Sequence, residues 1–380
     1  VAGMSILTAC SSDDNNDNDG NGGNGNGNEI ENGTILKGTI TSDVTLAAGN
    51  TYKLSGEYIV EEGATLHIEE GVKIIAVYDD IADYILVKQG GKINAVGTPD
   101  KPIVMTSEKE EPGAWGGIHI CGRAHTNAEG GKGSSEIGGA VYGGNDDADN
   151  SGTLQYIRLE YTGFAFDEEH EANGISFYGV GNGTIVDHCQ AYKGSDDGFE
   201  FFGGSVNVSN LVAVSCSDDS FDWTEGWNGK GTNLVAYQED KSTLGYDCDC
   251  LMECDNNGSN NAATPVAHPV LKNLILVGNG GSKQGIRLRA GTEVEIDNAK
   301  VCGKGQPLTV ETALTENALK NGTSKLTNIT LTSELSSKEG IYTHADFIAV
   351  TSNKVDANLS YSSFEDIRKE CSWMNGSWVK

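Results

Sequence analysis

The chain is poor in proline and has no long apolar or basic run, and these absences narrow its class. Only 6 of its 380 residues are proline. No apolar stretch approaches the roughly 18 residues that a membrane-spanning helix needs. Lys and Arg total 26 against 55 Asp and Glu, so the formal net charge is −29 and no basic cluster is present to meet a phosphate backbone. We therefore expect neither a helical membrane protein nor a nucleic-acid partner.

Several catalytic motifs are missing as well. The sequence contains no Gly-x-Ser-x-Gly nucleophile elbow, no phosphate-binding loop and no His-x-x-x-His pair of the metalloprotease type. An EF-hand is excluded because the loop that opens at Asp147 has Arg158 where a bidentate Glu is required. Nucleophilic chemistry by Ser or Cys therefore has no support in the sequence.

The first thirty residues predict an anchor and a tether. Leu7-Thr8-Ala9-Cys10 fits the cleavage site of bacterial lipoproteins, so we interpret 1–10 as the remnant of a signal with a lipid on Cys10. The stretch 11–33 is rich in Asn, Asp and Gly and predicts a disordered tether. The sequence thus predicts a monomer held at the outer membrane or cell surface of a Gram-negative bacterium, with this lipid as its only membrane contact.

Eight cysteines remain when Cys10 is set aside. Outside the cytosol an even number permits disulfides, whose pairing the sequence does not reveal. Cys248, Cys250 and Cys254 lie close together, but their spacing does not match a zinc knuckle. We expect no zinc site.

An Asn-containing segment recurs along the chain and indicates a solenoid. The dipeptide Asn-Leu, Asn-Ile or a close variant returns at intervals of 22 to 40 residues, each time beside a short apolar strand pattern. The recurring polar positions are His188, Asn210, Asn233, Asn273, Asn298 and Asn328. Stacked amides can bond to the coils above and below, about 4.8 Å away. This pattern predicts an all-β, single-stranded parallel β-helix of about twelve coils.

The expected domain limits follow from where this repetition starts and stops. We assign 34–340 to the parallel β-helix and 341–380 to a C-terminal cap. Ser362–Lys369 has an N-cap, early acids and late bases, which predicts a short helix. Together with Trp373 and Trp378, this helix is expected to seal the open end of the stack.

Several local segments resemble a known family. Gly97–Ser107, Gly113–Ile118, Tyr142–Asp146 and Trp373–Trp378 are similar to segments of secreted or lipid-anchored bacterial β-helix repeat lipoproteins. The resemblance covers about 35–380 and implies a right-handed β-helix outside the cytoplasm. It implies no particular activity, because this fold carries lyases, hydrolases, adhesins and scaffolds alike.

A second strand in each coil predicts a column of outward polar residues. Gly-Phe-Glu-Phe at 198–201 and Ser-Phe-Asp-Trp at 220–223 are two examples of this strand. Because side chains alternate along a strand, the residue between two apolar neighbours points outward. The predicted column contains Ser176, Glu200, Asp222, Glu253 and Arg287, and we take Glu200, Asp222, Glu253 and Arg287 as candidate catalytic residues. Nearby acids form two further predicted columns: Asp196, Asp218 and Asp249, and between them Asp197 and Asp219.

So many stacked carboxylates require a counter-charge. Two like charges about 5 Å apart repel by about 3 kcal/mol at an effective dielectric of 20. Calcium would offset this repulsion with carboxylate ligands, so we predict calcium at Asp196, Asp197, Asp218, Asp219 and Asp249. A shared proton would also offset it and would create a general acid. The bland alternative is that the Ser-Asp-Asp-Gly segments are only solvated turns.

Three functions remain open on this sequence. The first is a surface lipoprotein that binds polysaccharide or another glycan with the help of calcium, with Trp227 as the aromatic contact and Phe201 and Trp223 in the core. The second is an enzyme that uses the Glu200/Asp222/Glu253 column, either a glycoside hydrolase or a polysaccharide lyase with Arg287 as base. The third is a structural or adhesive scaffold without a small ligand.

Overall fold

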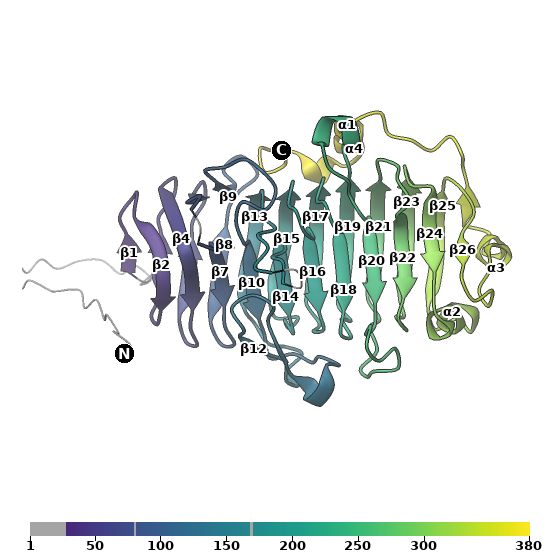
Figure 1. The fold of residues 1–380 in the computed structure, drawn as a ribbon, viewed down its shortest axis with the longest axis horizontal. Coiled ribbons are helices and arrows are strands. Elements are labelled where there is room, and N and C mark those ends of the chain that lie inside the picture. Colours follow the sequence, from purple (N-terminus) through teal and green to yellow (C-terminus); the bar gives the residue numbers. More distant parts are fainter. Residues whose placement is uncertain (1–27, 80, 168–169) are drawn as a thin grey trace, which may run out of the picture.

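The protein is an elongated stack of parallel coils. The computed structural model describes residues 28–79, 81–167 and 170–380. The expected lipid site at Cys10 and most of the predicted tether lie outside these residues. Within the described residues, all strand pairs of the large sheet are parallel, and each joins one coil to the next. A separate two-stranded hairpin in an insertion is antiparallel. The parallel β-helix predicted from the sequence is therefore confirmed (Figure 1).

Three ladders of parallel strands make up the coils. The first ladder begins with four short strands: β1 (Asn28–Ile30), β3 (Val44–Leu46), β5 (Thr65–Ile68) and β8 (Lys92–Val96). A ladder on an adjoining side begins with β2 (Ile35–Ile40), β4 (Thr51–Val60), β6 (Lys73–Ala76) and β9 (Ile103–Ser107). Both ladders then continue through the two halves of long strands: β13 (Gly152–Glu160), β15 (Ile185–Tyr192), β17 (Asn207–Val214), β19 (Lys230–Tyr237), β21 (Val270–Val277), β23 (Glu295–Cys302) and β25 (Lys325–Leu331).

The remaining ladder carries the site described below. It starts in the second halves of β2 and β4 and passes to the strands of the later coils. These strands are β7 (Tyr84–Val87), β10 (Ile118–Cys121), β14 (Ile175–Tyr178), β16 (Phe199–Phe202), β18 (Phe221–Thr224), β20 (Met252–Asp255), β22 (Gln284–Arg289), β24 (Gln306–Val310) and β26 (Ser336–Ser337).

The long strands bend at the polar residues that recur in the sequence. Each bend residue has a positive φ, for example 60° at Asn233 and 61° at Asn273. Asn tolerates this left-handed conformation better than most residues, which explains its recurrence. The side-chain amides form the predicted stack: Asn233 Nδ2 donates to Asn210 Oδ1 at 2.8 Å, and Asn273 Nδ2 donates to Asn233 Oδ1 at 3.0 Å. The stack is interrupted at each end, since Asn210 and Asn328 donate to Asp187 and Asp297 instead.

Apolar side chains from all three ladders fill the interior. Aromatic rings stack from coil to coil, with 5.0 Å between the ring centres of Phe177 and Phe201 and 5.6 Å between those of Phe199 and Phe221. All eight cysteines from Cys121 to Cys371 are buried free thiols. The helices in the described part of the chain are all too short or too polar to span a bilayer.

The C-terminal segment departs from its predicted place. The predicted helix is α4 (Phe364–Glu370), with Ser363 as N-cap. However, this helix and the following η2 (Ser372–Met374) run back along the side of the stack, and the chain ends near β13 (Figure 1). Ser377 donates a backbone hydrogen bond to Pro99, and Lys380 donates one to Gln190. We call 359–380 the C-terminal strap.

Two other helices cover the end of the stack. These are α2 (Ala313–Lys320) and α3 (His344–Ala349), and Phe347 of α3 is fully buried in the main core. The expectation that Trp373 and Trp378 seal this end is wrong, because Trp378 packs on the flank against His188 with 5.2 Å between ring centres. Outward apolar side chains of β17, β19 and β21 form an apolar flank, and the strap buries it.

The limits of the β-helix are wider than predicted. Strand β1 begins at Asn28, inside the predicted tether, and pairs with β3 because Ile30 packs on the core. At the other end, β27 (Lys354–Val355) pairs with β25 beyond residue 340.

An insertion between β10 and β13 covers part of one outer face. It contains η1 (Glu129–Gly131), β11 (Gly133–Ser134) and β12 (Val141–Tyr142). Its Ile137 and Tyr142 pack on Leu86, Tyr178 and other outward side chains of the third ladder. A short helix, α1 (Lys241–Leu244), lies in the connection between β19 and β20.

Candidate functional site: a carboxylate groove

The predicted outward column exists in the predicted order. Ser176 pairs with Glu200, Glu200 with Asp222, Asp222 with Glu253, and Glu253 with Arg287, each on the next strand from β14 to β22. The apolar residues that flank Glu200 and Asp222 are buried, as the alternation requires. Acids far apart in the sequence therefore lie one strand spacing apart on one face.

The Asp-Asp-Gly turns place the other acids beside this column. Gly198 follows Asp197, and a Cβ atom at Gly198 would lie 2.6 Å from the carbonyl oxygen of Ser220 on the next coil. Only glycine lets the coils approach so closely, and this fixes where the preceding acids project. Asp197 Oδ1 accepts the backbone N–H of Asp219 at 2.8 Å, and Asp219 Oδ1 accepts that of Cys250 at 2.7 Å. These two acids are thus bound into the turn stack.

Together these side chains line a groove of about 520 Å³. Ten acids and two cations surround it, and we call it the acidic groove. The lining residues are Glu136, Glu171, Asp196, Asp197, Glu200, Asp218, Asp219, Asp222, Asp249, Glu253, Lys283 and Arg287. The four candidate catalytic residues and the five candidate calcium ligands predicted from the sequence are all among them.

Burial and mutual repulsion act on these acids in the same direction. Burial, followed by the charge of Asp218, raises the pKa of Asp196 to about 7. Burial, followed by the charge of Asp249, raises the pKa of Asp218 to about 6. The pKa values of Glu200 and Asp222 are raised well above the usual range, chiefly by burial and then by neighbouring acids. Without a bound cation, the groove therefore retains protons near neutral pH.

The two cations are held at one end of the groove by ion pairs. Arg287 Nη1 lies 2.9 Å from Glu253 Oε1, and its Nε lies 3.2 Å from Glu311 Oε1. These acids raise the pKa of Arg287 despite its partial burial. Lys283 pairs with Asp249, and this hydrogen bond raises the pKa of Lys283. Both cations are thus engaged by acids, and the role of Arg287 as a base stays a prediction.

Two predicted site residues need reassignment. Trp227 is 1% exposed, and its ring stacks on Phe201 with 4.1 Å between centres, so it belongs to the core. The prediction that it contacts a glycan is wrong, because the chain after β18 turns this ring inward over the Phe stack. Glu253 is held by Arg289 as well as Arg287, with Arg289 Nη2 2.6 Å from Glu253 Oε2. This carboxylate is paired, unlike Glu200 and Asp222.

Other residues of the groove were missed in the sequence. Glu136 comes from the insertion and Glu171 from the loop before β14, where no strand pattern marks them. Asn173 donates to Glu200 Oε2 at 2.6 Å, while its own Oδ1 is buried without a partner. Asn173 lies one coil before Asp197 in the turn stack, so the recurrence of a polar residue before a glycine and an apolar residue, as in Asn-Gly-Ile and Asp-Gly-Phe, could have identified it.

Subsets of these acids have the spacing of metal ligands. One oxygen each from Asp197, Glu200 and Asp222 lies within 4.8 Å of the others. The same holds for Asp218, Asp219 and Asp249, and for Asp196, Asp197 and Asp218. Carboxylate oxygens are the ligands that Ca²⁺ prefers, and a cation would relieve the repulsion among them. The five predicted metal ligands therefore fall into two of these groups, which share Asp218.

Comparison with known proteins gives one assignment. Neither the curated proteins nor the solved structures contain a match to this chain. The family model described as the pectate-lyase like beta helix domain matches residues 38–379, which is most of the chain. That range starts within β2 and ends inside the strap, so it takes in the coil stack apart from β1 and the start of β2, and it includes the acidic groove. The chain belongs to the family of pectate-lyase like beta helix domains.

Proposed function

We propose that the acidic groove binds carbohydrate with the help of Ca²⁺, on a protein held at the bacterial outer membrane or cell surface by a lipid on Cys10. Family membership supports a carbohydrate-related function outside the cell. The observation that carries the calcium proposal is the convergence of acids from successive coils, with ligand oxygens within 4.8 Å of one another. Ca²⁺ needs six to eight oxygens, so a site of three carboxylates leaves positions for sugar hydroxyls or carboxylates.

The charge of the groove sets the role of the cation. Ten acids face two paired cations, so an anionic sugar would be repelled in the absence of metal. A bound Ca²⁺ would reverse the local sign and bridge the protein to the glycan. The ligand should therefore bind only when calcium is present.

Calcium titration by calorimetry on the soluble domain tests this proposal. Wild type is compared with Asp196→Asn/Asp218→Asn, which removes two charges and keeps the side-chain size. The matched control is Glu129→Gln/Glu334→Gln, which removes two exposed charges outside the groove. We expect heat of binding from wild type and control and at least tenfold weaker binding from the groove variant. Absence of calcium binding to wild type would refute the calcium proposal and favour a structural or adhesive scaffold without a small ligand.

A polysaccharide panel, with and without calcium, then tests the carbohydrate part. Retention of a glycan only in the presence of calcium supports the proposal. Retention that is equal with calcium and with chelator would refute the bridging role of the metal.

Glycoside hydrolysis is the second candidate, and one observation favours it. Glu200 and Asp222 oxygens lie within 4.8 Å, near the separation of about 5 Å used by retaining enzymes, and the raised pKa of Glu200 suits a proton donor. New reducing ends that vanish in Glu200→Gln would establish this activity. Elimination with Arg287 as base has less support, because Glu253 and Glu311 engage Arg287 and favour its charged form.

A further inference from the structure

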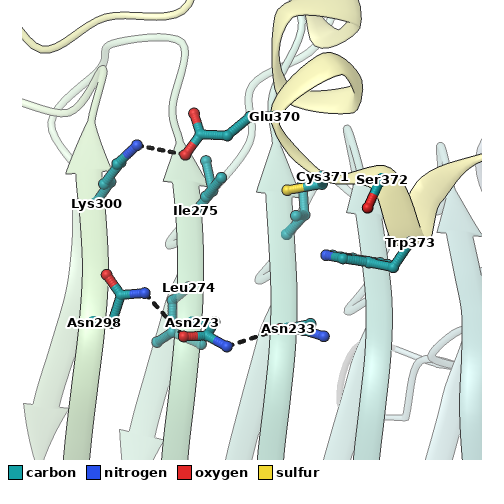
Figure 2. A pocket seen from close by; sticks show the side chains of 11 residues that line it. Asn233, Asn273, Leu274, Ile275, Asn298, Lys300, Glu370, Cys371, Ser372 and Trp373 are labelled. Atoms are coloured by element: carbon teal, nitrogen blue, oxygen red, sulfur yellow. Dashed lines mark hydrogen bonds and ion pairs between the residues drawn. The ribbon is translucent and has the colours of Figure 1, made fainter.

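A second cavity lies on a different side of the coil stack, under the C-terminal strap. Its volume is about 320 Å³, at the lower limit of small-molecule sites. The floor is formed by β19, β21 and β23, and the roof by the end of α4 and by η2 (Figure 2). The acidic groove lies on other strands, from β14 to β22, so the two sites share no lining residue.

The strap is fastened on both sides of this cavity. On one side Glu370 of α4 pairs with Lys300 of β23, and Tyr361 donates to Glu370 at 2.8 Å. On the other side Arg158 Nη1 donates to the carbonyl oxygen of Ser377 at 2.6 Å. Fully buried Ile367, Met374 and Trp378 anchor the strap between these points. The cavity is therefore preformed.

A row of amides forms one wall. Asn298 Nδ2 donates to Asn273 Oδ1 at 2.9 Å, and Asn273 donates in turn to Asn233 (Figure 2). An amide has two N–H donors and two acceptor lone pairs, and the stack uses one of each at Asn273. No other amide of the row uses the second donor of Asn233, Asn273 or Asn298, and these three side chains line the cavity at intervals of about one strand spacing.

The rest of the lining is apolar or electrically neutral. Val235 and Ile275 provide an apolar floor, and the one positive side chain, Lys300, is paired with the one negative side chain, Glu370. Trp373 borders the cavity from the strap. It is the only tryptophan of the five that keeps partial exposure, since the other four are at most 1% exposed.

In the coil of His188, the gap between the strap and the strand bend is filled by side chains of the protein itself. At His188, the residue that corresponds to these asparagines, the imidazole stacks on Tyr156 at 4.4 Å and meets Trp378 at 5.2 Å. Aromatic rings thus fill the gap between strap and bend there. Between Asn233 and Asn298 the same gap is left open and lined with amides.

We propose that this cavity binds a single uncharged pyranose sugar. A six-membered ring has the size of the rings that occupy the neighbouring gap. Its hydroxyl groups match the free amide donors and acceptors, while its C–H face suits Val235, Ile275 and the indole of Trp373. The cancelled charges of Lys300 and Glu370 favour a neutral ligand over an anionic one. This site would bind sugar without calcium and independently of the acidic groove.

Tryptophan fluorescence with D-glucose, D-galactose, D-mannose and D-xylose as probes tests this inference, in buffer with chelator. We expect a saturable change for at least one sugar, because the partly exposed Trp373 would report its binding. Asn273→Gly removes the amide yet retains a residue that accepts the φ of 61°. The matched control is Asn328→Gly, at the same bend position of a coil outside the cavity. We expect about tenfold weaker binding in the first variant and unchanged binding in the second.

Saturation-transfer NMR with the same sugars provides a readout that does not depend on Trp373. The inference is overturned if neither method detects a saturable sugar, or if the two Gly variants bind alike. Binding that persists in Asp196→Asn/Asp218→Asn separates this site from the acidic groove, and binding that disappears there would assign the signal to the groove instead.

Discussion

Asp196 and Asp218 occupy the same position on successive coils, and the charge of Asp218 is second only to burial in raising the pKa of Asp196 to about 7. The stacking of coils that forms the fold therefore also brings like charges together in the groove and raises the pKa values of its acids. Several predictions of stability and binding rest on this relationship.

The groove should make the metal-free protein less stable as the pH rises. The folded pKa values of Asp196 and Asp218, about 7 and about 6, lie above the value of about 4 expected in the unfolded chain. The folded state then holds more protons between these limits, so the free energy of unfolding is highest below pH 4 and falls as the pH rises through 6 to 7. With chelator present, the stability advantage of Asp196→Asn/Asp218→Asn over wild type should grow by roughly 2 to 3 kcal/mol from pH 5 to pH 8, counted from Asp196 alone because the Asp218 side chain is exposed and screened by solvent. Thermal unfolding at both values measures this difference, and parallel curves would contradict it.

Calcium binding should release protons near pH 6.5. Asp196 and Asp218 are partly protonated there, and a metal ligand must be deprotonated. Calorimetry in two buffers with different heats of ionisation should give different apparent enthalpies at pH 6.5 and similar ones at pH 8.5. Affinity should fall about tenfold from pH 7.5 to pH 5.5. An affinity independent of pH would mean that calcium binds elsewhere.

Arg289 should contribute more to stability than an exposed cation. Its Nε and Nη2 lie 2.7 Å from Asp255 and 2.6 Å from Glu253. Removing Arg289 takes the ion-pair partner from the shielded Asp255, whereas Glu253 keeps Arg287. Arg289→Met should lower the free energy of unfolding by about 2 kcal/mol. Lys325→Met breaks an exposed pair with Glu295 and should cost less than about 0.5 kcal/mol. Denaturant titration compares the two, and equal losses would show that the Arg289 pairs are solvent-screened.

Trp227 should behave as a core residue. Trp227→Ala removes a ring stacked on Phe201 and should cost about 3 to 5 kcal/mol. Trp373→Ala, on the strap, should cost about 1 kcal/mol because its ring is only partly buried. Urea unfolding measures both changes. A Trp227 variant with normal stability and lost glycan retention would restore the surface role predicted from the sequence.

The sequence predicted the column of Glu200, Asp222, Glu253 and Arg287 because two short-range rules suffice for it. Alternation along a strand decides which residue points outward, and the recurring strand motif marks equivalent residues even though the coils differ in length. The turn acids Asp196 and Asp218 followed from the same register. Glu136 and Glu171 could not be found in this way, because they come from loops whose course depends on packing against Tyr178 and its neighbours.

The path of the strap is the other feature that the sequence did not predict. The helix at Phe364–Glu370 has local signals, and its N-cap Ser363 could be read directly. Its position could not, because it depends on Val212, Val235 and Ile275, outward residues of distant strands that together form an apolar flank. Such a flank exists only after the coils have stacked.

Short-range features of the sequence set the geometry of each coil. They are the left-handed asparagine bend, the alternation of inward and outward residues and the glycine that lets one turn approach the next, and each depends on neighbouring residues alone. The tertiary structure decided which distant side chains share a surface. It turned Trp227 into the core, paired Arg287 with Glu253 and Glu311, and laid the strap over the flank, because burial and ion pairing depend on neighbours that only the stacked coils bring together.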